Sequence, residues 1–393
     1  MQQTTADEQK KLLVLALACI LFSISFAVIL NRNYSTLYRS DIFFRWYATE
    51  KLFSENRNLY DSQNETEVTT FVYGSPRKTN FYYPAHLIIF TGPLALLPYS
   101  TAHIVWTTTV QFFFIISVWL SMRLAGWPDS INKLTLFLVM AIFFIPSLQH
   151  TIWGQFNSIG LLSLVLCYQA LRNRQYTLAG VLAGGLTFKP HTTVLTLLFL
   201  LVWTIFKQER WGFYLGFLLA GLAMWASAEI FQPGWVCDFL AILGDYNPAQ
   251  SVIDCVWNPH QALAGALVLA SGVILAHNRR ADAKSSAFAG CIALSLAVWS
   301  LVVPVIGMLH IIALPIAAVM VLSGLKRAYL TLYTPALYSM LLVYLLGIVG
   351  FFVGLSSPEL YGMHIAWSEL AYKITAPILI TLFSVPLCLK PSD

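Results

Sequence analysis

The stretch LLVLALACILFSISFAVIL, residues Leu12–Leu30, decides the fold class of this chain. It carries no charged side chain over 19 residues, and a helix that crosses a bilayer needs about 20 mainly apolar residues. Lys10 and Lys11 precede it, as they would in a secretory signal, but no small-residue cleavage pattern follows it. We therefore interpret Leu12–Leu30 as a retained membrane anchor.

Comparable apolar stretches recur along the whole chain. Examples are Ile104–Trp119, Trp211–Phe231, Ser286–Val303 and Leu332–Val353. The 393 residues are 58% hydrophobic and 10% charged, with a mean hydropathy of +0.69, whereas soluble domains contain roughly 25% charged residues. The sequence therefore predicts an all-α polytopic membrane helix bundle with about eleven to thirteen membrane segments.

The basic residues predict the orientation of the bundle, because cytoplasmic loops collect Lys and Arg. They gather at Lys10/Lys11, Arg172/Arg174, Lys207/Arg210, Arg279/Arg280/Lys284 and Lys326/Arg327. The net charge of +5 is therefore a topology signal and does not indicate nucleic-acid binding. The polar segments that remain all fall on the noncytoplasmic face: Asn31–Asn80, Trp153–Asn157, Gln232–Asn258, the neighbourhood of His310, and Ser356–Trp367.

This topology requires irregular segments in the membrane. Arg172 and Lys207 share a side only if Thr177–Phe206 forms two short helices that meet near Lys189, because Pro190 disfavours helix in the residue before it. Between residues 81 and 150 two alternatives stay open. Either the proline-bounded piece at 84–98 does not fully cross, or the piece at 134–149 is re-entrant.

Asp41 is a candidate catalytic base. Residues 41–61 mix apolar and aromatic side chains with charged ones, which is typical of an amphipathic helix on a membrane surface. Asp41 begins that segment just after the first span, and a carboxylate beside lipid is costly and is usually kept for function. The alternative is that Ser40 and Asp41 only cap the helix, since both are good N-cap residues.

Polar residues at two other breaks are candidate ligand contacts. Gln155 and Asn157, between two apolar runs, either hydrogen-bond a polar ligand or cap the next helix. Lys189 either extends its side chain to the interface or pairs with an anion. Irregular backbone around it should line a cavity, because unpaired backbone groups are not tolerated against lipid.

Weaker signals come from single residues. Tyr83 at a membrane boundary is typical of an interfacial anchor, and His310 in a proline-bounded span is either a core residue or a functional one. His260 and Gln261 begin a span after the outer loop and are consistent with a cap. The six cysteines lack metal-site spacing, so no metal is predicted; Cys237 and Cys255 share one loop and form either a disulfide or two free thiols.

Taken in order, these motifs resemble those of glycosyltransferase family 87 (GT87, DUF2029), integral-membrane enzymes that include polyprenyl-phosphate-mannose-dependent α-mannosyltransferases. Each motif is short, but five occur in the family's order over about residues 10–325. The matching residues are Asp41 with Tyr47, Ala48, Leu59, Tyr60 and Asp61; Phe81, Tyr83 and Pro84 with Pro93–Pro98; Gly154, Gln155 and Asn157; Ala179 and Gly180 through Lys189 and Pro190; and Pro304 with His310 and Pro315.

The resemblance implies the GT-C fold, a lipid-linked sugar donor, and transfer on the face opposite the cytoplasm. It places Asp41 at the family's catalytic aspartate and His310 at its late membrane histidine. Two departures leave the sugar and the acceptor open. Where the family tends toward Ser-Pro-x-Ser-Trp-x-His-His, residues 303–310 keep only Pro304 and His310, and Ala85 replaces a second proline.

We therefore expect a single domain, residues 1–393, with a catalytic module at 1–210 and C-terminal helices at 211–393 that complete the donor and acceptor cavity. The expected reaction moves a sugar, mannose first, from a polyprenyl-phosphate donor to a lipid-linked or envelope glycan acceptor, with inversion and without a cofactor, in a bacterial inner membrane. The expected donor contacts are Lys189, His310, Gln155 and Asn157, and the residues expected to line the acceptor cavity are Tyr47, Tyr83, His260 and Gln261. The rival classes are a lipid-linked sugar transporter, which shares broken helices and intramembrane charges, and a noncatalytic scaffold.

Overall fold

The computed structural model describes residues 6–77, 81–128, 130–189, 192–245, 259–302, 311–356, 368 and 370–390. Within these residues the chain forms helices and no strand, which confirms the predicted all-α fold. The helices are, in chain order, α1 (Ala6–Asn31), α2 (Tyr34–Tyr38), α3 (Asp41–Glu55), α4 (Ser62–Tyr73), η1 (Ala85–Leu87), α5 (Ile88–Ala95), α6 (Tyr99–Ala125), α7 (Ile131–Ile142), α8 (Ile145–Ile152), α9 (Asn157–Arg172), α10 (Tyr176–Gly184), η2 (Gly185–Phe188), α11 (Val194–Ile205), η4 (Gln208–Arg210), α12 (Gly212–Phe231), α13 (Trp235–Asp245), α15 (Pro259–His277), α16 (Ser286–Val302), α17 (Leu314–Ala328), α18 (Leu330–Ser356), η7 (Leu370–Thr375) and α20 (Ala376–Leu389).

Five of these helical segments are long and apolar enough to cross a membrane. They are Leu13–Asn31, Tyr99–Ala125, Gln208–Phe231, Leu330–Val353 and Leu370–Leu389. Helices α7 and α8 pass the same test together, bent by 53°, and five shorter apolar helices accompany them in the described residues. The chain is therefore a polytopic membrane helix bundle, and its first span coincides with the predicted anchor.

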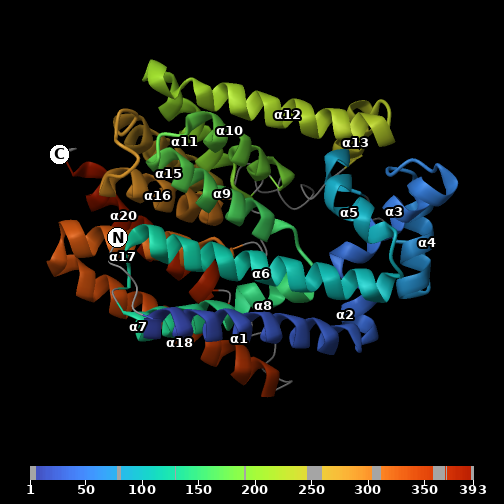
Figure 1. The fold of residues 1–393 in the computed structure, drawn as a ribbon, viewed down its shortest axis with the longest axis horizontal. Helices are drawn as coiled ribbons and strands as arrows, with labels where there is room; N and C mark the ends of the chain where they lie inside the picture. The colour runs from blue at the N-terminus through green and yellow to red at the C-terminus, as the bar shows by residue number, and fades with distance from the viewer. Residues whose placement is uncertain are drawn as a thin grey trace.

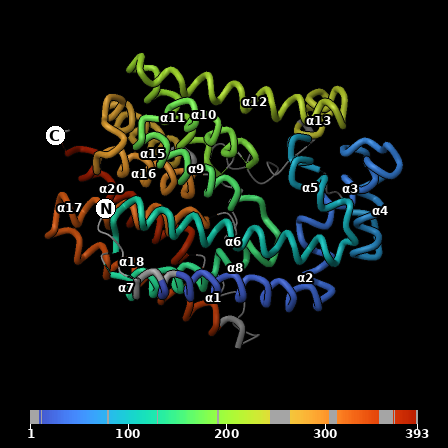
Figure 2. Tube along the Cα trace, in the orientation of Figure 1, coloured from blue at the N-terminus to red at the C-terminus, as the bar shows by residue number. Residues whose placement is uncertain are grey.

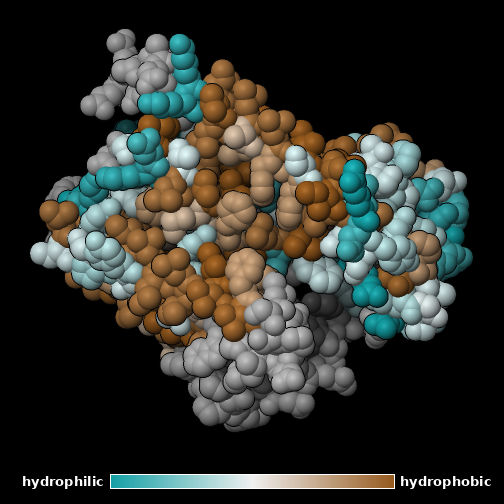
Figure 3. All heavy atoms as spheres, turned by 90° about the horizontal axis from the view of Figure 1, so that it is seen from below, coloured by the Kyte–Doolittle hydropathy of each residue, from teal (hydrophilic) through white to brown (hydrophobic). Residues whose placement is uncertain are grey.

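The long helices run roughly along one axis of the molecule (Figure 1). Both chain ends lie at one end of this axis, and α2, α3, α4, α5 and α13 gather at the other (Figures 1 and 2). Seen from below, apolar residues dominate the middle of the surface and hydrophilic residues lie toward both sides (Figure 3). This is the surface expected of a protein whose middle lies in hydrocarbon.

The irregular segments appear where the charge topology requires them. Helix α10 with η2 ends at Phe188, and α11 begins at Val194, so the predicted pair of short helices is confirmed. Between residues 81 and 150, η1 with α5 covers only Ala85–Ala95, and α7 and α8 are bent by 53°, a geometry shared by broken spans and re-entrant loops, so both alternatives stay predictions. The amphipathic helix is shorter than predicted: α3 ends at Glu55, since Asn56 takes a left-handed conformation with φ 55°.

Two buried apolar clusters hold the bundle together. The larger joins α6, α7, α9, α11, α16, α17 and α20, and the smaller joins α3, α4, η1, α5 and the first half of α6. Close backbone approach fixes α10 against α12, since a Cβ at Gly216 would lie 1.9 Å from the carbonyl oxygen of Thr177. Small residues permit such approach in membranes, where packing replaces the hydrophobic effect. The break at Lys189 is thus anchored on one side.

Candidate active site

The start of α3 is attached to the turn between α8 and α9. The backbone N–H of Asp41 donates a hydrogen bond of 2.9 Å to the carbonyl of Trp153. Ser40 is the N-cap residue, but its hydroxyl makes no cap bond and instead lies 2.9 Å from the hydroxyl of Tyr99. The carboxylate of Asp41 is therefore directed at the turn, and capping does not account for its position.

Gln155 connects Asp41 to Lys189. Its Nε2 donates a hydrogen bond to Oδ2 of Asp41, and its Oε1 accepts one from Nζ of Lys189. Gln155 and Lys189 are buried, with exposed fractions of 3% and 5%, whereas the Asp41 side chain is 33% exposed. The partly exposed carboxylate of Asp41 is thus hydrogen-bonded to the buried amide of Gln155, which is in turn hydrogen-bonded to the buried ammonium group of Lys189. Three residues from three separate segments, all predicted for the site, meet here.

Arg45 is a fourth member of this site that the sequence analysis missed. Its Nη1 donates a 3.0 Å hydrogen bond to the carbonyl of Asp41 and lies 4.0 Å from Oδ1 of the same residue. Its guanidinium carbon is 4.9 Å from the ring centre of Tyr83, and Nζ of Lys189 is 5.7 Å from that centre. One ring therefore contacts two cations. The i, i+4 spacing of Asp41 and Arg45 is the signal that could have found it.

Several other residues predicted for the site are not among those that the structure brings into contact with Asp41. Asn157, 3% exposed, is the first residue of α9, whose N-cap is Phe156, and no side chain caps this helix. His260 and Gln261 lie in the first turn of α15, where the structure describes the backbone only. His310 and Cys255 lie outside the described residues, and Cys237 is exposed on α13. Both alternatives for Cys237 and Cys255, a disulfide or two free thiols, stay predictions, as do the predicted roles of the other residues.

Tyr47 points toward α4. Its hydroxyl donates a 2.6 Å hydrogen bond to Glu67, which also accepts one of 2.6 Å from Arg57. These two hydrogen bonds, that of Tyr47 first, lower the pKa of Glu67 to about 2 against the opposing effect of desolvation. Glu67 is thus a carboxylate at any physiological pH and ties α3 to α4. Whether Tyr47 also lines an acceptor cavity stays a prediction.

Gly154 allows the turn that carries Gln155 to pack on α3. Its φ is +61°, and a Cβ there would lie 3.0 Å from Cγ2 of Ile42. The carbonyl of Gly154 also accepts a 2.8 Å hydrogen bond from Nε1 of Trp106 on α6. The turn is therefore held between α3 and α6, and this contact places the Gln155 amide beside Asp41.

Gly154→Ala is expected to destabilise the protein by about 1–3 kcal/mol, because alanine strains a left-handed backbone and also meets Ile42. Specific activity of the folded fraction should fall as Gln155 shifts. Gly74→Ala is the matched control, because Gly74 has φ +74° but nothing lies within 4 Å of its Cβ position. Thermal melting and activity are measured on all three proteins. Equal behaviour of the two variants would contradict the role of the Ile42 contact.

Hydrogen bonds from Thr192 and Thr193 pair two backbone carbonyls beside the break at Lys189. The carbonyl of Lys189 accepts hydrogen bonds from the backbone N–H of Thr192 at 3.1 Å and from its hydroxyl at 2.9 Å. The hydroxyl of Thr193 donates to the carbonyl of Leu186 at 2.9 Å. Non-helical backbone persists at membrane depth when protein groups pair it, so the break can hold Lys189 in a defined position.

Within the described part of the chain, no three His, Cys, Asp or Glu side chains come close enough to form a metal site. The functional groups that meet at this site are a partly exposed carboxylate, two buried cations and an aromatic ring. A carboxylate can accept a proton, and adjacent cations can hold an anion.

The chain matches glycosyltransferase family 87 over residues 81–349 and belongs to that family. It is therefore a membrane glycosyltransferase. No curated protein and no solved structure matches it significantly. The matched residues include Tyr83, Gln155 and Lys189, whereas Asp41 and Arg45 precede them and join the site only through the fold.

Proposed function

We propose that this glycosyltransferase moves a sugar, mannose being the expected one, from a polyprenyl-phosphate donor to a lipid-linked or envelope glycan acceptor. The observation that carries the proposal is the placement of two buried cations, Arg45 and Lys189, beside one carboxylate, Asp41. This arrangement has an excess of positive charge, and buried charge is costly without a partner. An anionic ligand such as the donor phosphate would balance it.

The side chain of Arg45 provides a second reason to propose an anionic ligand at this site. Its Nε is buried and has no hydrogen-bond partner among the described residues. Buried donors are nearly always paired, and each unpaired one carries a free-energy cost. A phosphate oxygen is a suitable acceptor, because guanidinium groups bind phosphate through two parallel hydrogen bonds.

In the proposed mechanism, Asp41 takes the proton from the acceptor hydroxyl as its oxygen attacks the anomeric carbon. The bond between that carbon and the phosphate oxygen breaks, and the electron pair leaves with polyprenyl phosphate. Lys189 and Arg45 stabilise the charge that develops on the phosphate. With one base and one displacement, the configuration at the anomeric carbon inverts. Gln155 holds the carboxylate and the ammonium at a fixed separation.

A transfer assay tests this proposal. The purified protein is incubated with radiolabelled polyprenyl-phosphate mannose and a membrane glycolipid extract, and label in the glycan is measured. GDP-mannose, which has no hydrocarbon chain, is the matched donor control. Transfer from the polyprenyl donor alone supports the proposal. Movement of the donor between leaflets without any transfer would instead indicate the transporter class.

We also propose that the site faces the noncytoplasmic side, and single-cysteine labelling tests this. Ser62 is exposed at the end of the molecule that holds the site, and Arg280 is exposed among the basic residues of the opposite side. After the six native cysteines are replaced, Ser62→Cys should react with an impermeant thiol reagent in intact cells. Arg280→Cys should react only after permeabilisation. The opposite result would reverse the orientation.

A further inference from the structure

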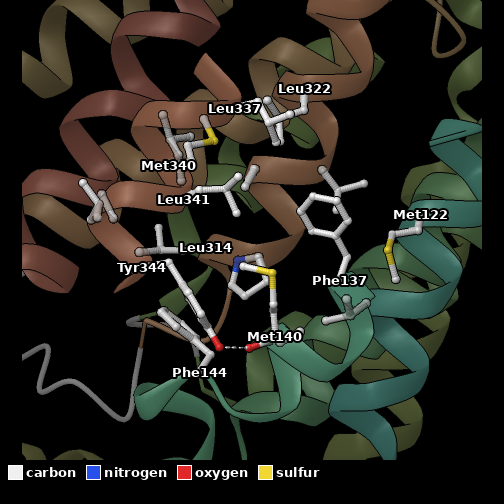
Figure 4. Close-up of a pocket in the computed structure, with 18 of the residues that line it drawn as sticks. Met122, Phe137, Met140, Phe144, Leu314, Leu322, Leu337, Met340, Leu341 and Tyr344 are labelled. Carbon is white, nitrogen blue, oxygen red and sulfur yellow. Dashed lines mark hydrogen bonds between the residues drawn. The ribbon is translucent and has the colours of Figure 1, made fainter. Parts of the chain in front are cut away.

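A cavity of about 120 Å³ lies at a distance from the site described above. Residues of α6 and α7 line it on one side and residues of α17, α18 and α20 on the other (Figure 4). Val118 on α6 lines it, and Trp106, twelve residues earlier on the same helix, contacts Gly154. At 1.5 Å per residue the two positions are about 18 Å apart.

The wall of this cavity is formed mainly by apolar side chains. None of its lining residues is charged, and three of the eight methionines of the chain, Met122, Met140 and Met340, belong to it. The hydroxyl of Tyr344 donates a 2.8 Å hydrogen bond to the carbonyl of Met140, as Figure 4 shows, and that of Tyr372 donates to the carbonyl of Tyr344 at 2.8 Å. Methionine adapts to flexible apolar ligands, so the wall suits a hydrocarbon chain.

A second cavity lies beside this one, on a side of the bundle that exposes large apolar residues. It has a volume of about 350 Å³, and Val343 lines both cavities. Leu346, Val349 and Leu370 line the second one and are exposed on the outside of the bundle. The residues of α18 that line the two cavities extend from Leu337 to Val353, over about 24 Å, whereas one leaflet contributes about 15 Å of hydrocarbon. An acyl chain of the surrounding bilayer can therefore lie along this apolar lining.

Cations lie where this space approaches the basic side of the membrane. Lys326 is one helical turn beyond Leu322, and Lys133 is one turn before Phe137; both cations are exposed, and both apolar residues line the cavity. Residues four apart lie on the same helix face. Arg327 ties the end of α17 to α6 by donating a hydrogen bond to the carbonyl of Ala125.

We propose that this cavity binds an acyl chain of an anionic phospholipid, with the lipid phosphate held by Lys133 and Lys326. The apolar wall selects the chain, and the cations select the headgroup. The basic side is the one that the distribution of Lys and Arg assigns to the cytoplasm, where the inner leaflet supplies anionic lipid. This lipid site is separate from the transfer site and does not depend on the proposed sugar reaction.

Thermal melting of the purified full-length chain with added lipid tests this proposal. Phosphatidylglycerol should bind about 30-fold more tightly than phosphatidylcholine with the same acyl chains, which corresponds to two cation contacts near a membrane surface. The double variant Lys133→Gln/Lys326→Gln should lose most of this preference. Arg280→Gln/Lys284→Gln, which removes two exposed cations from another loop on the basic side, should retain it.

A cavity-filling variant distinguishes binding of the acyl chain from binding of the lipid headgroup. Ala318→Phe, or Leu341→Phe if the first variant folds poorly, should abolish stabilisation by phosphatidylglycerol. Wild-type protein without preference for the anionic lipid would overturn the proposal, as would equal losses in the two charge variants. Stabilisation by polyprenyl phosphate that Ala318→Phe removes would also overturn it, because the cavity would then hold a prenyl chain.

Discussion

Asp41→Asn is expected to lower turnover by about 10²- to 10⁴-fold, the usual effect of losing a general base. Asparagine keeps the size of the side chain but cannot accept the acceptor's proton. Its carbonyl oxygen can still accept the hydrogen bond of Gln155, so the fold should persist. The measurement is the rate of sugar transfer at saturating donor, together with the melting temperature.

Glu50→Gln is the matched control for this experiment. It lies on the same helix, α3, and also removes one carboxylate, but its partner is Lys51 at 3.6 Å and not a residue of the site. Its activity should stay close to that of the wild type, because surface ion pairs contribute little. Full activity in Asp41→Asn, with normal folding, would remove Asp41 from the role of base.

Lys189→Met is expected to raise the KM for the donor by about 10- to 100-fold, which corresponds to one lost charge-assisted hydrogen bond. Methionine keeps the buried stem and removes the charge, so the packing around the break should be retained. Lys189→Arg should recover part of the affinity, because the contact depends largely on charge. Donor dependence of the rate is measured for all three proteins.

The same substitutions distinguish a lysine that binds the donor from one that only supports the fold. A structural lysine would give a lower melting temperature in Lys189→Met with an unchanged KM per folded molecule. A phosphate-binding lysine would give a higher KM without a lower melting temperature, because removing a buried charge relieves its desolvation cost. An unchanged KM in Lys189→Met would therefore contradict the proposed phosphate contact.

The sequence by itself determined the class of the fold and the places where helices break. Apolar runs such as Leu12–Leu30 identify spans, because the length of a helix in hydrocarbon is set by the bilayer. The positive-inside rule places Arg172 and Lys207 on the same side of the membrane. Together with Pro190, this predicts two short helices around Lys189, and the structure contains them. These signals are local, so they can be read along the chain.

Only the tertiary structure decided which polar residues meet. Gln155 lies 114 residues from Asp41 and 34 from Lys189 along the chain, and no local pattern encodes their contact. It depends on the Gly154 turn packing against Ile42, a long-range steric fit. The apolar cavity is formed by helices from both halves of the chain, so it exists only once the bundle has packed.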